Sequence, residues 1–139
     1  MRTNFNSKNN PRVIIIQKLY SKYYNQDHNL DFPKHRFKKF IKDIVLGTIE
    51  RNELILDELN TNFGDDFVLE NLDKVFQTIL KAATYEFMYR PNISINIIIK
   101  EYLISSNFFL EDTQTKYLNA LLDNIGKKLR TSNAWIWIN

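Results

Sequence analysis

Residue types that usually carry enzyme chemistry are scarce in this chain and poorly spaced for it. The chain has no cysteine, and its two histidines, His28 and His35, do not stand in a zinc-binding pattern. Its three glycines, Gly47, Gly64 and Gly126, are too far apart to form a phosphate-binding loop. No serine stands in the Gly-x-Ser-x-Gly pattern of hydrolases. We therefore expect no catalytic residue, no metal and no cofactor.

The basic residues are concentrated in the first third of the chain. Residues 1–42 contain ten Lys or Arg and two Asp, whereas residues 43–139 contain nine basic and fourteen acidic residues. A basic end on an otherwise acidic chain can bind a polyanion such as nucleic acid. Charge alone leaves a second interpretation open, in which these lysines only solvate helix faces.

Three tyrosines add an aromatic component to this basic region. Tyr20, Tyr23 and Tyr24 lie among Lys18 and Lys22. Single-stranded RNA is held by basic groups on its phosphates and by aromatic rings on its bases. Alternatively, Tyr20 and Tyr23 belong to the apolar face of a helix. The spacing favours that alternative for Tyr23 and does not decide between the two for Tyr20.

The first half of the chain has the periodicity of helices. Pro11 suits the first turn of a helix that extends through Tyr23, and residues 25–33 predict a loop. A helical period restarts at Phe37 and reaches Leu59, as one long helix or as two joined near Gly47. Residues 64–66 predict the next break.

The second half continues this helical pattern. An amphipathic stripe covers residues 69–87, and residues 90–92 end it, because a residue before proline avoids the helical conformation. Ser94 is a predicted N-cap for the next helix, and Thr113 is a predicted N-cap for the last one. Residues 134–138 alternate like a strand, but no partner strand is predicted, so we expect this tail to pack on the helices or stay loose.

These elements predict an all-α fold of six or seven helices in two halves that meet near residues 60–68. The chain is long enough for one domain with its own core. No N-terminal apolar run indicates a signal peptide, and no apolar run is long enough to cross a bilayer. The absence of cysteine fits a reducing cytoplasm.

Several segments follow a shared pattern, in order and spacing, from about residue 11 to about residue 130. Residues 12–21 contain an Arg, a Gln and a Leu-Tyr-Ser sequence, and residues 79–87 read Ile-Leu-Lys-Ala-Ala-Thr-Tyr-Glu-Phe. The same register continues through residues 90–94, 98–102 and 116–125. Together these segments resemble the NusB family of transcription antitermination factors, and most of all its alphaproteobacterial members.

This resemblance implies a fold and a function. The fold would be two small helical bundles, about residues 11–62 and 67–130, packed into one compact domain between an N-terminal arm (1–10) and a C-terminal tail (131–139). The function would be RNA binding without catalysis. With the small-subunit ribosomal protein NusE, such a protein binds the boxA element of nascent ribosomal transcripts and helps RNA polymerase read through terminators in the cytoplasm.

The resemblance also assigns residues to two kinds of contact. The RNA-binding residues it implies lie at both ends of the chain: Lys8, Arg12, Gln17, Tyr20, Lys116, Tyr117 and Asn119. The candidates for contact with the protein partner are charged residues of the long central helix: Asp73, Lys81 and Glu86. For these three, an exposed helix charge without a partner is an equally supported interpretation.

The chain departs from the family pattern in its N-terminal arm. Where the family has a run of arginines before the first helix, this chain has Lys8, two asparagines and then Arg12. Arginine binds phosphate through two parallel hydrogen bonds, so fewer arginines mean fewer such contacts. Four basic residues of the next segment would compensate if their face is turned to RNA: Lys34, Arg36, Lys38 and Lys39.

Two alternatives to the antitermination function remain open at this stage. One is the RNA-binding module of a ribosomal RNA methyltransferase, although the 139 residues include no S-adenosylmethionine-binding domain. The other is a helical protein-interaction module without RNA binding.

Overall fold

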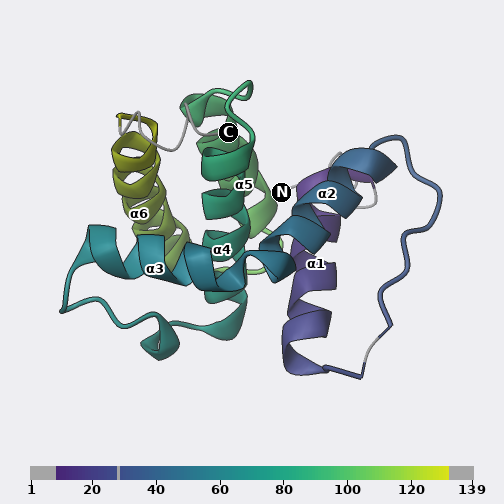
Figure 1. Ribbon diagram of the computed structural model, residues 1–139, viewed down its shortest axis with the longest axis horizontal. Helices are drawn as coiled ribbons and strands as arrows, with labels where there is room; N and C mark the ends of the chain where they lie inside the picture. The colour runs from purple at the N-terminus through teal and green to yellow at the C-terminus, as the bar shows by residue number, and fades with distance from the viewer. Residues whose placement is uncertain (1–8, 28, 132–139) are drawn as a thin grey trace.

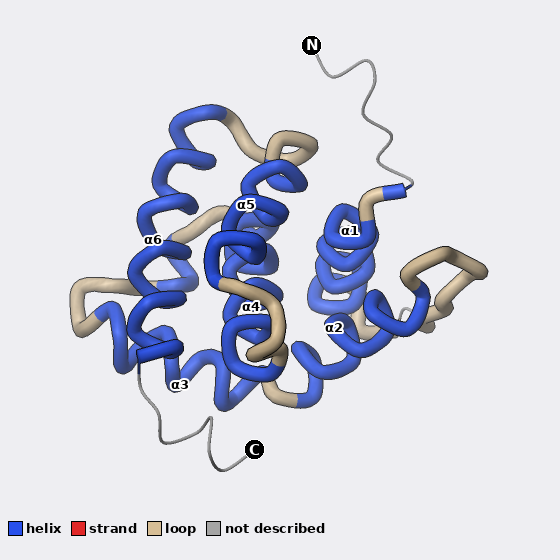
Figure 2. The backbone as a smooth tube through the Cα atoms, turned by 90° about the horizontal axis from the view of Figure 1, so that it is seen from above, coloured by secondary structure: helices blue, strands red, loops and turns tan. Residues whose placement is uncertain are grey.

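The protein is all-helical throughout the part that the computed structural model describes, residues 9–27 and 29–131 (Figures 1 and 2). This confirms the predicted fold class. No helix within these residues is long and apolar enough to span a membrane. The elements of this part are α1 (Pro11–Tyr24), α2 (Lys38–Glu50), α3 (Asn52–Phe63), the short 3₁₀-helix η2 (Leu69–Asn71), α4 (Lys74–Tyr89), α5 (Ile95–Ser106) and α6 (Asp112–Thr131).

Helix α1 begins where the sequence predicts it. The side chain of Asn10 accepts hydrogen bonds from the backbone N–H groups of Arg12 and Val13, and Pro11 occupies the first turn. Proline costs nothing there, because its missing N–H would have no partner within the helix. The loop that follows begins at Asn25 and runs to Phe37, four residues beyond its predicted end.

The second helical period forms two helices, and the break lies at Arg51 rather than near Gly47. Gly47 is buried inside α2, where a Cβ atom would overlap the ring of Tyr85 from α4. That ring is held in place, because its hydroxyl donates to Asp43 Oδ1 at 3.3 Å. Burial and then the Asp43 carboxylate raise the pKa of Tyr85 to about 12. Gly47 therefore permits a close helix contact and does not form a turn.

Helix α4 is the centre of the molecule and packs against each of the other five α-helices (Figure 1). From Thr78 to Met88 every residue except Lys81 is buried, as expected for a helix with neighbours on most sides. The helix starts at Lys74, later than the predicted stripe, and Leu69 is buried from the short η2 turn instead. It ends before Pro91, as predicted.

The caps of the last two helices differ in how well the sequence predicts them. The Ser94 side chain accepts a hydrogen bond from the Ile97 N–H, which confirms it as the N-cap of α5. Thr113, by contrast, lies inside the first turn of α6, so its predicted capping role is wrong. The Gln114 side chain accepts from the Glu111 N–H and satisfies the donor just before this helix.

One apolar cluster forms the core and includes side chains from all six α-helices of the described residues. The division into bundles at 11–62 and 67–130 stays a prediction. The alternating tail at 134–138 lies outside the described residues.

Replacing Gly47 with alanine tests the close contact between α2 and α4. Overpacking costs about 1–3 kcal/mol, and the better helix propensity of alanine returns about 1 kcal/mol. We expect a net loss of about 1 kcal/mol in the free energy of unfolding, measured by urea denaturation. In a Tyr85→Leu background the same change should cost less, because the ring is gone. Equal costs in both backgrounds would contradict this explanation.

Candidate nucleic-acid interface

Two of the predicted RNA-binding residues line one open pocket. Gln17 and Tyr20 on α1 face Asp73 and Val75 at the start of α4, with Phe109 from the link between α5 and α6. The pocket has a volume of about 400 Å³. Tyr20 is 40% exposed, so it is not one of the core residues of α1. Its role in RNA binding stays a prediction.

The start of α4 connects this pocket to α6. Tyr117, which is 47% exposed, packs its ring against that of Phe76 with 5.6 Å between the centroids. Phe76 directly follows Val75, which lines the pocket beside Tyr20. Of two consecutive residues in this turn, Val75 therefore lines the pocket of Tyr20 and Phe76 packs against Tyr117. Lys116 is exposed next to Tyr117.

The remaining RNA-binding candidate of α6 is placed differently. Asn119 lines a groove between α5 and α6, together with Asn96, Lys100 and Thr115. It does not line the pocket of Gln17 and Tyr20. Lys8 lies outside the described residues.

The tyrosines at the end of α1 form an aromatic cluster with two lysines of α4. The rings of Tyr20 and Tyr24 are 4.9 Å apart, and Lys74 Nζ lies 4.8 Å from the ring centroid of Tyr24. Lys81 Nζ lies 4.4 Å from that of Tyr23. The sequence places Lys18 and Lys22 beside these tyrosines but does not predict that Lys74 and Lys81, the latter a candidate for partner contact, lie over their rings. No local signal indicates them, since they are about fifty residues away in the chain.

Burial determines the ionisation of this cluster. It raises the pKa of Tyr23 and of Tyr24, and neighbouring groups add to both shifts: Tyr24 acts on Tyr23, while Tyr20 and Asp73 act on Tyr24. Both shifts move the titration of these hydroxyls further above neutral pH. Burial also lowers the pKa of Lys81. This residue is only partly exposed, and its ammonium is already in contact with an aromatic ring.

Arg12 and Glu86 are not available for the contacts that the family resemblance implies. Their side chains are 8% and 0% exposed and form a two-point ion pair, with Arg12 Nε donating to Glu86 Oε2 at 3.0 Å and NH2 donating to Oε1 at 2.6 Å. The roles of Arg12 in RNA binding and of Glu86 in partner binding stay predictions, and in this structure neither side chain is exposed for them. Each side chain is committed to the other, and together they fasten α1 to α4.

Aromatic rings enclose this ion pair. The Arg12 guanidinium lies 5.0 Å from the ring centroid of Phe40 on α2 and 5.4 Å from that of Tyr102 on α5. Burial alone would lower the pKa of Arg12, but Tyr102 and Glu86 raise it above its ordinary value. The arginine therefore stays charged, and one side chain contacts three other helices.

Replacing Arg12 with methionine should destabilise the protein strongly. Removal of one partner of a buried ion pair leaves an unpaired charge and costs about 3–5 kcal/mol. The double variant Arg12→Met/Glu86→Leu should recover most of this loss, because it buries no charge. Arg36→Met, at an exposed arginine, is the control. Urea denaturation measures all three, and an Arg12→Met variant as stable as that control would refute the structural role.

The fold and this surface together define a class of protein: a small all-helical domain with tyrosines exposed on its first and last helices. Residues 4–127 of the sequence match the NusB family. The chain belongs to this family, which confirms the resemblance found in its sequence.

Individual relatives carry the name transcription antitermination protein NusB. The protein of Sinorhizobium fredii is 35% identical over 92 residues, which cover 66% of this chain and 57% of that relative. The protein of Sphingopyxis alaskensis is 31% identical over 91 residues, with coverages of 66% and 61%. The matched regions thus span less than two thirds of either relative. Both organisms are alphaproteobacteria, as the resemblance indicated.

A solved structure agrees with the fold. The T. maritima NusB structure superimposes with a TM-score of 0.74, covering 85% of this chain and 89% of the other. The two sequences are 22% identical, so this match supports the fold alone.

Proposed function

We propose that this protein is an RNA-binding transcription antitermination factor. With the ribosomal protein NusE it binds boxA RNA in nascent ribosomal transcripts and promotes processive transcription by RNA polymerase. The observation that carries the proposal is that Tyr20 and Tyr117, from opposite ends of a NusB-family chain, are both exposed next to the first turn of α4.

This surface suits single-stranded RNA. The exposed faces of Tyr20 and Tyr117 offer stacking platforms for two unpaired bases, and such stacking is worth about 1–3 kcal/mol per base. Gln17 supplies an amide that can donate to and accept from a base edge, and Lys116 supplies a positive charge for a phosphate. The protein binds in this proposal and performs no chemistry.

The protein partner is required because the RNA surface of this chain is small. Arg12 is buried in an ion pair, so it adds no phosphate contact to an arm that already has few arginines. Of the three partner candidates, Asp73 alone is in the exposed class, and it lines the same pocket as Tyr20. A partner bound at Asp73 would extend the RNA surface directly from this pocket.

Tyrosine substitutions test the RNA surface. Tyr20→Ala and Tyr117→Ala should each weaken binding of boxA RNA to the complex with NusE by about 1–3 kcal/mol, because each removes a stacking platform. Leu54→Ala, which removes an exposed apolar side chain from α3, is the control and should have no effect. Fluorescence anisotropy with labelled RNA gives the affinities, and thermal melting checks that each variant is folded.

Two further comparisons decide the specificity. The protein alone should bind boxA RNA more weakly than the complex does, and a scrambled RNA should bind the complex more weakly than boxA does. Equal affinity for both RNAs would refute sequence recognition. If the complex bound neither RNA, the chain would instead be a helical protein-interaction module.

A further inference from the structure

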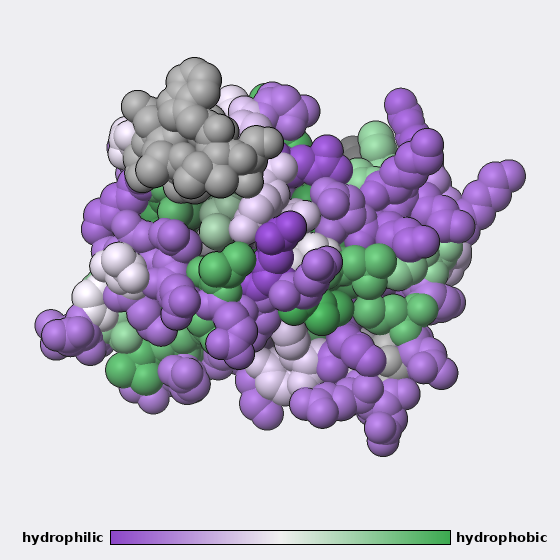
Figure 3. Space-filling view, in the orientation of Figure 1, coloured by the Kyte–Doolittle hydropathy of each residue, from purple (hydrophilic) through white to green (hydrophobic). Residues whose placement is uncertain are grey.

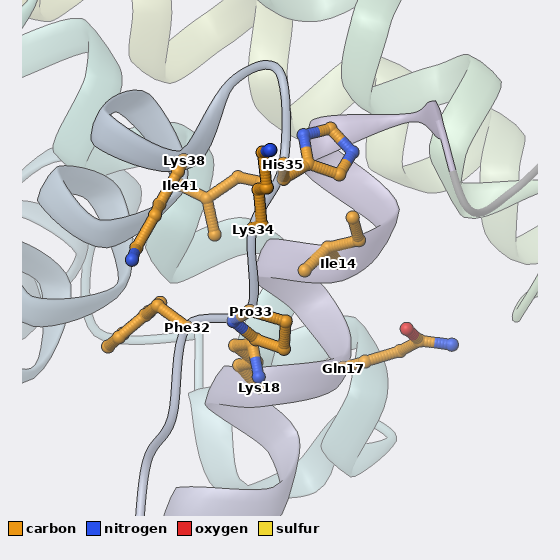
Figure 4. A pocket seen from close by; sticks show the side chains of 9 residues that line it. All are labelled: Ile14, Gln17, Lys18, Phe32, Pro33, Lys34, His35, Lys38 and Ile41. Atoms are coloured by element: carbon orange, nitrogen blue, oxygen red, sulfur yellow. The ribbon is translucent and has the colours of Figure 1, made fainter.

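A second pocket lies on the other side of α1, between this helix, α2 and the connection that joins them (Figure 4). Its volume is about 570 Å³, within the range of sites that enclose small ligands. Figure 4 shows that α1 contributes one wall, the connecting loop another, and the first turn of α2 a third. The tyrosine surface described above does not include this pocket, except for one shared residue.

The rim of the pocket is strongly basic. Lys18, Lys34 and Lys38 line it together with His35. Lys34 and Lys38 are exposed, and neither forms an ion pair with any residue that the structure describes. The carboxylate of Asp31 pairs with Lys18 at 3.6 Å but is itself 79% exposed. The rim therefore keeps a positive charge that an anion would neutralise.

The surrounding segment adds to this charge. Residues 34–42 contain five Lys or Arg and no acidic residue. Arg36 lies over the exposed ring of Phe37, 5.2 Å from its centroid. Figure 3 shows long hydrophilic side chains projecting along this edge of the molecule, with apolar surface beside them.

The inside of the pocket is apolar. Ile14 and Ile41 line it from the two helices, and Phe32 and Pro33 line it from the loop. Lys18 Nζ lies 5.5 Å from the ring centroid of Phe32. A ligand that suits this pocket has a flat apolar part for the interior and an anionic part for the rim. A nucleotide of single-stranded nucleic acid has both, joined at a suitable distance.

Gln17 joins this pocket to the proposed RNA surface. It lines both the tyrosine pocket and the basic one. On a helix with 3.6 residues per turn, Gln17 and Tyr20 lie on one stripe, while Ile14 and Lys18 lie on the adjacent stripe. An RNA strand that lies along α1 at Gln17 therefore passes directly beside the basic pocket.

We propose that the basic pocket is a second RNA-binding site, which takes one nucleotide of the same single strand. The Lys34 and Lys38 ammonium groups bind its phosphate, and its base enters the apolar interior beside Phe32. This inference rests on the proposed function. It also supplies phosphate contacts for a chain whose first helix begins with a buried arginine.

An acidic peptide is the competing ligand for a basic rim. RNA is favoured because the pocket is continuous with the tyrosine surface through Gln17 and because its interior accepts a flat ring. A peptide carboxylate would use the rim alone.

The full-length double variant Lys34→Gln/Lys38→Gln tests the site. In complex with NusE it should bind boxA RNA roughly tenfold more weakly than the unmodified protein, with a log–log salt slope reduced by about 0.7, the value for one phosphate that the two lysines no longer neutralise. The control Lys127→Gln/Lys128→Gln removes the same charge from exposed positions near the end of α6 and should change neither quantity. Thermal melting confirms that both double variants are folded.

The outcomes separate this inference from the proposed function. If the unmodified complex binds RNA and the Lys34/Lys38 variant binds it equally well, the pocket is not on the RNA path, while the proposed function stands. If both double variants lose affinity equally, the effect is general charge removal, and the inference is overturned.

An oligoglutamate peptide of matched charge tests the competing ligand. If it binds the complex as tightly as RNA does, and if the Lys34/Lys38 variant weakens both equally, the inference is also overturned. If the unmodified complex binds no RNA, the proposed function fails first.

Discussion

The buried ion pair between Arg12 and Glu86 is the interaction on which the arrangement of the other helices depends. It joins the first turn of α1 to the last part of α4, and Phe40 and Tyr102 bring α2 and α5 against the same guanidinium. A buried ion pair contributes little net stability compared with a well-packed apolar contact, but its geometry is demanding. It therefore fixes where α1 lies, and the exposed face of α1 carries both pockets described above.

The position of α4 explains how residues from both ends of the chain form one surface. This helix contacts every other α-helix of the described residues, and its first turn lies between the exposed parts of α1 and α6. Val75 and Phe76 have neither charge nor a reactive group, yet Val75 lines the pocket of Tyr20 and Phe76 packs against the ring of Tyr117. The binding surface is thus a product of helix packing, and no single segment of the chain contains it.

Local signals in the sequence predicted the helices well, and tertiary contacts account for what they missed. Proline at position 11 and Ser94 act through neighbouring backbone atoms, so their roles follow from sequence alone. Gly47 appeared to mark a break, because its close contact with Tyr85, thirty-eight residues later, leaves no local pattern. The family resemblance located Gln17, Tyr20 and Tyr117 on exposed surfaces.

The same resemblance gave no indication that two of its charged positions are partners. Arg12 and Glu86 are separated by seventy-four residues, and as isolated letters each is typical of a solvent-exposed side chain. Pairing across that distance can be seen only when the helices are assembled. The lysines over Tyr23 and Tyr24 were missed for the same reason.

The support of two tyrosines by the first turn of α4 has a consequence for the motions of the molecule. Helix ends are where local opening needs the least free energy, and this turn follows only a short 3₁₀ segment and a capping aspartate. When it opens, the pocket wall at Val75 and the ring contact between Phe76 and Tyr117 are lost together. A ligand that contacts both tyrosines would bind only the form in which this helical turn is closed. Binding of the ligand and fraying of the turn would therefore compete with each other.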